Sequence, residues 1–219
     1  MLGSHDTFTY LKAEDWFTRL LKPFWKCQSM TLQEQYDYGV RFFDIRINRN
    51  YKPGLFNKIF HKKDNSPYWS LGHGIAEIEE NKEFQFNTVE DICKYFNTKF
   101  PDSYYRIIFE RGNNNDKEIF KQQIIGLENK YFGLCWYGIK KPWITLYYNP
   151  PFSNFDELTC KLFNWDIEKS FWFNIKKFKI NYIIKPYAKS HNPKITKEIL
   201  ENKNKVIFID YIGIEKGES

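Results

Sequence analysis

Apolar and polar side chains alternate in several short stretches of the chain, and this period-two pattern predicts β-strands. In the strand expected over 40–47, three apolar side chains share one face, while the opposite face carries Asp44 and Arg46. The apolar face would pack in the core, so the other face is left for polar contacts. Further strands are predicted over 68–73, 104–110, 133–138, 143–148, 171–184 and 205–212.

Other stretches have apolar residues at the spacing of an α-helix. Two of them open with a capping box, Thr31-x-x-Glu34 and Thr88-x-x-Asp91, which marks the start of a helix. Helices are predicted over 14–25, 31–38, 88–99, 116–130, 153–163 and 193–202.

Helices and strands that alternate in this way are typical of an α/β fold. Polar residues cluster where the strands end, and the carboxyl ends of parallel strands are where an α/β barrel builds its active site. We therefore expect a compact (β/α)8 barrel near the lower size limit of that fold. Because no repeat or linker divides the chain, one domain is expected over 1–219, with 48–67 as an inserted loop.

The composition narrows the class of protein. The 219 residues are 42% hydrophobic and 27% charged, which excludes a disordered, collagen-like or coiled-coil chain. No apolar run approaches the ~18 residues of a transmembrane helix, which argues against an integral membrane protein. The formal charge of +6 suits an anionic partner. No nucleic-acid-binding motif accompanies that charge, so nucleic acid is not the expected partner.

The four cysteines, Cys27, Cys93, Cys135 and Cys160, are widely scattered. They form no C-x-x-C pair and have no histidine at the spacing of zinc ligands, so no zinc site is predicted. A chain of this size also needs no disulfide framework. The thiols are expected to be core residues.

Two segments near the amino terminus hold residues suited to chemistry. His5 and Asp6 follow a very short apolar start, where a helix cap is the simpler explanation. Asp44 and Arg46 share a strand face, either as a structural ion pair or as a guanidinium fork for a phosphate. The spacing leaves both explanations open.

Two later segments add to this set. His73 lies between two glycines, which allow a ligand to approach closely or simply form a tight turn. Asp210 ends an apolar strand and would be costly to bury without a partner. A histidine would be a useful partner, because a carboxylate fixes its tautomer and supports its imidazolium form. Together the segments hold the groups needed for general acid–base cleavage of a phosphodiester around a cationic clamp.

These residues lie in four motifs, Leu2–Thr7, Trp25–Arg46, Gly72–Gly74 and Ile209–Tyr211. In their order and spacing the motifs resemble phosphatidylinositol-specific phospholipase C, and specifically the bacterial-type catalytic X-domain. The resemblance implies a distorted (β/α)8 barrel of the PLC-like phosphodiesterase superfamily. Two residues precede Gly3 and nine follow Asp210, so we expect an incomplete first strand and last helix.

The resemblance also implies a reaction. Phosphatidylinositol-type lipids would be cleaved by internal attack of the inositol 2-hydroxyl, giving diacylglycerol and a cyclic inositol phosphate. His5 would take the proton from that hydroxyl as general base, and Asp210 would orient His5. Arg46 would bind the phosphate and stabilise the charge that develops on its oxygens.

The remaining roles concern the leaving group and the headgroup. His73, assisted by Asp6, would act as general acid and protonate the diacylglycerol oxygen. Asp44 would hold the arginine or the inositol side of the site. Glu110 stands where bacterial relatives usually have a basic, substrate-contacting residue, and Arg111 follows it. Both residues are expected to contact the substrate.

No metal and no other cofactor is expected. Eukaryotic relatives carry a carboxylate at position 46 and need calcium, whereas the guanidinium of Arg46 supplies a fixed positive charge and would repel Ca²⁺. Two alternatives remain open. One is a metal-dependent, glycerophosphodiester-type phosphodiesterase on the same barrel, with Asp6, Asp44 and Glu110 around a cation. The other is a non-catalytic phosphoinositide- or membrane-binding module.

A lipid substrate implies that a monomer contacts the membrane surface peripherally. Trp16 and Phe17 are expected in the core as the apolar face of a helix, and Trp25 is a weak candidate for membrane contact. The compartment is left open: secreted or membrane-peripheral if a leader has been removed, otherwise cytoplasmic. Further candidates for interfacial contact are Phe56, Phe60, Lys62 and Lys63.

Overall fold

The computed structural model describes residues 2–13, 16–22, 25–49, 68–73, 76–78, 84, 86–141, 144–147 and 207–213. Its helices are α1 (Trp16–Leu20), α2 (Leu32–Asp37), α4 (Val89–Lys99), α5 (Asn114–Ile124) and α6 (Leu127–Lys130). Its strands are β1 (Leu2–Ser4), β2 (Phe42–Asn48), β3 (Ser70–His73), β4 (Ala76–Glu77), β5 (Tyr104–Arg111), β6 (Leu134–Lys141), β7 (Ile144–Tyr147) and β8 (Ile207–Ile209). The elements predicted over 153–163, 171–184 and 193–202 lie outside the described residues, as does 50–67 of the predicted insertion.

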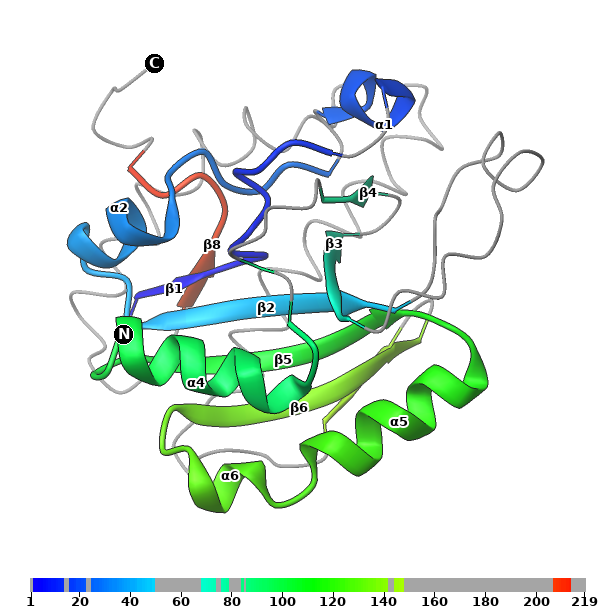
Figure 1. Ribbon diagram of the computed structural model, residues 1–219. Coiled ribbons are helices and arrows are strands. Elements are labelled where there is room, and N and C mark those ends of the chain that lie inside the picture. Colours follow the sequence, from blue (N-terminus) through cyan, green and yellow to red (C-terminus); the bar gives the residue numbers. More distant parts are fainter. Residues whose placement is uncertain are drawn as a thin grey trace.

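The centre of the sheet is parallel (Figure 1). The strands β8, β1, β2, β5 and β6 are neighbours in that order, and each pairs in parallel with the next. The last described strand thus pairs with the first, Leu2–Ser4 against Ile207–Ile209, which is a pairing that a closed barrel requires. The predicted α/β class with a parallel sheet is confirmed. Closure of the barrel stays a prediction, because 148–206 lies outside the described residues.

Two strands depart from the predicted series of β-then-α units. β3 runs antiparallel to the end of β2, with Leu71 opposite Ile47, and pairs in turn with β4. β7 runs antiparallel to β6, from which two residues separate it. A connection that short allows only a hairpin, because a parallel neighbour needs a crossover of roughly a dozen residues or more. The two strands predicted over 133–138 and 143–148 are therefore both present, but as an antiparallel pair, and β3 adds another antiparallel partner.

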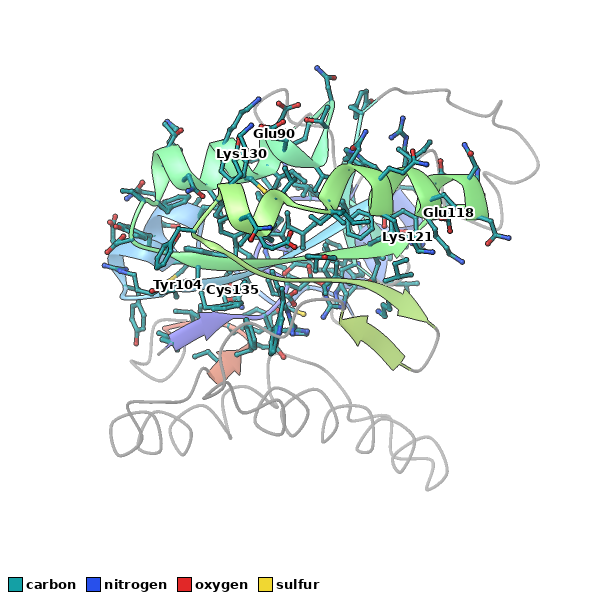
Figure 2. All side chains as sticks on the ribbon, turned by 90° about the horizontal axis from the view of Figure 1, so that it is seen from below. Glu90, Tyr104, Glu118, Lys121, Lys130 and Cys135 are labelled. Atoms are coloured by element: carbon teal, nitrogen blue, oxygen red, sulfur yellow. The ribbon has the colours of Figure 1, made fainter. Side chains whose placement is uncertain are left out.

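Helices α4, α5 and α6 cover one face of the sheet, as Figures 1 and 2 both show. The β2 side chains Phe43, Ile45 and Ile47 are fully buried on that face, as their alternation predicts. They share one core cluster with Phe96 of α4 and Phe120 of α5. The helices thus pack on one face of the sheet, and the polar residues of β2 lie on the other face.

The two helices predicted from capping boxes are confirmed within a residue at both ends. Thr31 and Thr88 cap α2 and α4 with complete capping boxes. The single helix predicted over 116–130 is wrong, because the chain forms two helices, α5 and α6. Gly126 between them has φ +84°, a left-handed conformation in which a right-handed helix cannot continue.

The first helix differs from its prediction in length and in what it buries. α1 has five residues in place of the range 14–25, and Trp16 is 69% exposed, so the expected core position of Trp16 is wrong. The side chain of Phe17 lies outside the described residues. Trp25 is only 2% exposed, and its indole Nε1–H donates to the Thr18 carbonyl at 2.7 Å. Because its polar atom is satisfied inside the protein, Trp25 is a core residue and not a membrane contact.

On the face of the sheet opposite the helices, apolar side chains lie at one end of the strands and polar side chains at the other. At the amino ends of β2 and β6 lies a small apolar cluster, in the region where Figure 2 labels Tyr104 and Cys135. The guanidinium of Arg106 covers this cluster, 4.3 Å from the centre of the Phe208 ring. Polar side chains follow toward the carboxyl ends of the strands. The cluster consists of Phe42, Cys135, Trp136 and Phe208.

Two further expectations concern the thiols and the membrane. Cys27, Cys93 and Cys135 are buried and free, as predicted, and Cys160 lies outside the described residues. Among the residues that the structure describes, no helix is long and apolar enough to cross a membrane.

Candidate functional site

The parallel strands bring the candidate residues together at one edge of the sheet. His5 and Asp6 directly follow β1, and Asp210 directly follows β8, its parallel neighbour. Arg46 lies near the carboxyl end of β2, and Glu110 lies near that of β5. His73 ends β3, which runs antiparallel along the last residues of β2. These six residues come from distant parts of the sequence and are all largely buried.

His5 and Asp210 form a hydrogen-bonded pair. His5 Nδ1 lies 2.7 Å from Asp210 Oδ1, and His5 Nε2 lies 2.8 Å from Arg46 Nη2. Arginine can only donate, so Nε2 accepts, and the proton of the neutral ring is on Nδ1, where it is donated to Asp210. His5 therefore presents an unprotonated Nε2 beside a guanidinium, which is the state that a general base needs.

The backbone around this pair is held by Gln28, which is fully buried. Its amide Nε2 donates to the carbonyls of His5 (3.0 Å) and Ile209 (2.8 Å), and its Oε1 accepts from the Ile212 N–H (3.2 Å). One side chain thus ties the end of β1 to the end of β8. Gln28 lies in the Trp25–Arg46 motif that resembles the phospholipase family. Nothing in the local sequence pattern indicates its role in joining two strands, so this role was not predicted.

Both turns after the paired strands are conformationally strained. Asp6 has φ +46° and Tyr211 has φ +49°, and each directly follows one member of the His5–Asp210 pair. Residues other than glycine, and a tyrosine above all, rarely adopt this left-handed region, so surrounding contacts must hold it. The Tyr211 N–H donates to the Cys27 carbonyl at 2.6 Å, which is one such contact.

Asp44 joins two guanidinium groups. Its Oδ1 accepts from Arg106 Nε at 2.7 Å, and its Oδ2 accepts from Arg46 Nε and Nη2, both at 3.2 Å. Burial alone would raise the pKa of Asp44, but the charges of Arg106 and Arg46 outweigh it and hold the pKa well below the usual value. Asp44 is therefore an anion that fixes Arg46 in place. Arg106 was missed, although strand alternation puts it on the same face of β5 as Glu110.

Glu110 is the second anion bound to Arg46. Its Oε2 lies 3.4 Å from Arg46 Nη1, and its Oε1 accepts from Lys140 Nζ at 2.5 Å. Burial would raise the pKa of Glu110, but the charges of Lys140 and Arg46 lower it to about 2. Lys140 was also missed by sequence analysis. Arg111 follows Glu110, so its side chain lies on the opposite face of β5, and its contact with substrate stays a prediction.

Replacing Glu110 with glutamine should lower the free energy of unfolding at neutral pH by roughly 3 kcal/mol, because two cations lose a buried charged partner. The pKa of Glu110 falls from 4.5 to about 2 on folding, so its contribution is present above pH 4.5 and disappears as the pH falls toward about 2. Denaturant unfolding at several pH values should show the difference between the two proteins shrinking across this window.

Glu118→Gln is the matched control for that measurement. Glu118 is exposed on α5, where its Oε1 lies 2.7 Å from Lys121 Nζ, and both residues are labelled in Figure 2. Loss of an exposed pair should change stability by less than about 1 kcal/mol. A Glu110→Gln effect that does not vary with pH, or that matches the control, would contradict the assignment.

His73 and Asp6 form the second histidine–carboxylate pair. His73 Nδ1 lies 2.6 Å from the Trp25 carbonyl oxygen and 3.0 Å from Asp6 Oδ2. Because a carbonyl can only accept, the ring proton is on Nδ1 and Nε2 is left for another partner. Burial lowers the pKa of His73 well below its usual value, and the charges of Arg46 and Lys140 lower it further. Burial also raises the pKa of Asp6, although Arg46 opposes this. The surroundings thus disfavour an ion pair between the two groups.

The two histidines face one another across the site. Their ring centroids are 6.0 Å apart and the rings are nearly perpendicular. Arg46 contacts His5 at Nε2, and its Nε lies 3.6 Å from Asp6 Oδ2 on the side of His73. Two rings that can exchange protons, with a guanidinium beside both histidine–carboxylate pairs, can serve acid–base cleavage of an anionic ester.

The site can be compared with known proteins only through its fold. No family model and no curated protein sequence matches the chain. The structure is similar to that of phosphatidylinositol-specific phospholipase C from Listeria monocytogenes, with a TM-score of 0.53 and 14% sequence identity. The similarity covers 96% of this chain and 87% of that enzyme. The chain therefore has a PLC-like fold, as the sequence motifs predict.

Proposed function

We propose that this protein is a phosphodiesterase that cleaves phosphatidylinositol-type lipids by internal attack of the inositol 2-hydroxyl, giving diacylglycerol and a cyclic inositol phosphate. The observation that carries the proposal is the pair of histidine–carboxylate contacts, His5–Asp210 and His73–Asp6, with Arg46 beside both. The fold shared with the Listeria enzyme supports the same substrate class.

In the first step, His5 takes the proton of the 2-hydroxyl. Its Nε2 is unprotonated because Arg46 donates to it, and Asp210 stabilises the positive charge that the ring gains. Substrate binding replaces the contact between His5 and Arg46. The Nη2 group of Arg46, held in place, then donates to the phosphate, and His5 Nε2 accepts from the hydroxyl.

In the second step, His73 gives a proton to the glycerol oxygen as it leaves. The pKa of His73 is low in the free protein because the ring is buried near two cations. A bound phosphate adds a negative charge beside the ring, which raises that pKa and favours the imidazolium form. Asp6, 3.0 Å from Nδ1, then stabilises this form. Substrate thus creates the general acid that its own cleavage needs.

Arg46 binds the phosphate, and the protein holds Arg46 rigid for that purpose. Asp44 and Glu110 fix its guanidinium from two sides, and Asp44 is itself anchored by Arg106. A fixed cation stabilises the charge that develops on the phosphate oxygens without having to reorganise during the reaction.

The proposed reaction uses no metal. Asp44 and Glu110, two of the three carboxylates suggested as ligands in the metal-dependent alternative, are each bound to cationic side chains. A divalent ion at that place would have to displace Arg46, Arg106 or Lys140 from them. This arrangement favours the metal-independent phosphodiesterase over that alternative.

We also propose that the protein contacts membranes peripherally. Trp16 and Leu20 of α1 are 69% and 68% exposed and are four residues apart, so they lie on the same face of the helix. Tryptophan at such a position is favoured at the interface between lipid and water.

The test is incubation with vesicles that contain phosphatidylinositol, followed by ³¹P NMR of the soluble products. A cyclic inositol phosphate should appear, and it should form equally well in EDTA. Vesicles of phosphatidylcholine, which has no hydroxyl placed for internal attack, should give no product. Absence of any product from phosphatidylinositol would leave the non-catalytic binding module. Activity that EDTA removes and a divalent cation restores would favour the metal-dependent enzyme.

A further inference from the structure

Cys27 lies between the two histidine–carboxylate pairs of the site. Its ligand atom belongs to two groups, one with His5 and Asp210 and one with Asp6 and His73, and in each group the three ligand atoms lie within 4.8 Å of one another. The thiol is almost fully buried. The proposed reaction gives this thiol no role, so its place between the two pairs remains to be explained.

The group on the His73 side has the spacing of a metal site. Cys27 Sγ lies 3.8 Å from His73 Nδ1, and Asp6 Oδ2 lies 3.0 Å from the same atom. Zinc bonds of about 2.0–2.3 Å in tetrahedral geometry put ligand atoms roughly 3.3–3.7 Å apart. These two distances lie close to that range, and all three ligand atoms lie within 4.8 Å of one another, so small movements of the side chains would let one ion bind them. The Trp25 carbonyl oxygen, 3.6 Å from Sγ, is close enough to complete the set.

Asp6 supplies a second and independent observation. Its Oδ2 is buried and has no hydrogen-bond partner, although it faces His73 Nδ1. A buried carboxylate oxygen without a hydrogen bond is costly and is satisfied by a cation. Arg46 Nε is 3.6 Å away from this oxygen, which is beyond hydrogen-bond distance, and it donates to Asp44 instead.

We propose that Cys27, His73 and Asp6 form a site for a soft divalent cation such as Zn²⁺ or Cd²⁺, and that metal bound there inhibits the enzyme. Thiolate, imidazole and carboxylate are the ligands that Zn²⁺ takes in proteins. On binding, the thiol proton is released to solvent, and the His73 ring proton moves from Nδ1 to Nε2. A ring whose Nδ1 holds a metal cannot take up the second proton, so His73 can no longer become the imidazolium acid.

The binding test does not depend on turnover. Cd²⁺ alone is titrated into the 219-residue protein, and the ultraviolet charge-transfer band of a thiolate–cadmium bond is recorded together with the imidazole NMR signals of His73. One equivalent should produce the band and shift those signals. Cys27→Ser should weaken binding at least about 100-fold, since even loss of a supporting group near a metal costs roughly 10–100-fold.

Four further variants serve as controls for this test. Cys93→Ser and Cys135→Ser change buried thiols far from the histidines, and Cys160→Ser changes the thiol outside the described residues, so all three should keep the band. Asp6→Asn should weaken Cd²⁺ binding while leaving the thiol in place. A band that persists in Cys27→Ser, or His73 signals that Cd²⁺ does not shift, would overturn the proposal. If Cd²⁺ binds as described but phosphatidylinositol is not cleaved, the metal site stands and the proposed function fails.

Discussion

Replacing His5 with alanine should lower kcat for phosphatidylinositol cleavage at least about 100-fold, the usual cost of losing a general base. The expected loss is this large because, among the residues that the structure describes, the other histidine near the site is already engaged. His73 Nδ1 donates to the Trp25 carbonyl at 2.6 Å, and the centroid of its ring lies 6.0 Å from that of His5. Initial rates on mixed vesicles measure the effect.

Asp210→Asn tests the contribution of the carboxylate that is bound to the proposed base, His5. Asparagine keeps the shape at that position but removes the charge 2.7 Å from Nδ1, so the rate should fall while His5 remains present. The pH profile should change as well, because a neutral partner no longer supports the imidazolium form. Circular dichroism and thermal unfolding must show that both variants fold. A folded His5→Ala protein with nearly full activity would refute the assignment of His5 as base.

Local pattern was sufficient to predict much of the scaffold. Alternation in β2 correctly separates Phe43, Ile45 and Ile47, which pack against the helices, from Asp44 and Arg46, which face the site. Capping boxes are equally local, because one side chain and the backbone three residues later decide them. Such features depend on neighbours within a few residues of each other, and a single sequence contains that information.

The contacts between strands could not be predicted in the same way. Arg106 lies directly opposite Asp44 in the register of β2 and β5, and their side chains form the ion pair below the site. Alternation shows which way Arg106 points, but not which residue of another strand it meets. The same limit applies to Lys140 and Gln28, whose partners lie on other elements.

The errors near the amino terminus have a different cause. Helical spacing over 14–25 predicts a core position for Trp16, and Trp25 is weakly predicted to contact membrane, yet α1 ends at Leu20. Beyond that residue, spacing no longer indicates a face, and the indole of Trp25 is buried through its bond to the Thr18 carbonyl. Short helices obtain their stability from tertiary packing, so their length is poorly determined by local sequence.

Arg46→Lys should lower both kcat and kcat/KM by about 10²- to 10³-fold, the cost of losing one preorganised donor in an oxyanion-binding site. The substitution keeps the positive charge, so it tests geometry alone. Arg46 contacts His5, Asp44 and Glu110 at the same time through a planar fork. A lysine has a single ammonium at the end of a flexible chain and cannot hold these directions together.

Arg41→Lys provides the matched control, since Arg41 is partly exposed and its guanidinium bonds the exposed Asp102 at 3.1 Å. That variant should keep its activity within about threefold, because surface pairs contribute little and the residue lies outside the site. The imidazole NMR signals of His5 give a second readout, as loss of the Arg46 donor should shift Nε2 in the first variant only. If Arg46→Lys were as active as Arg41→Lys, charge alone would suffice at position 46. The rigid support from Asp44, Glu110 and Arg106 would then serve folding, and the proposed clamp on the phosphate would be wrong.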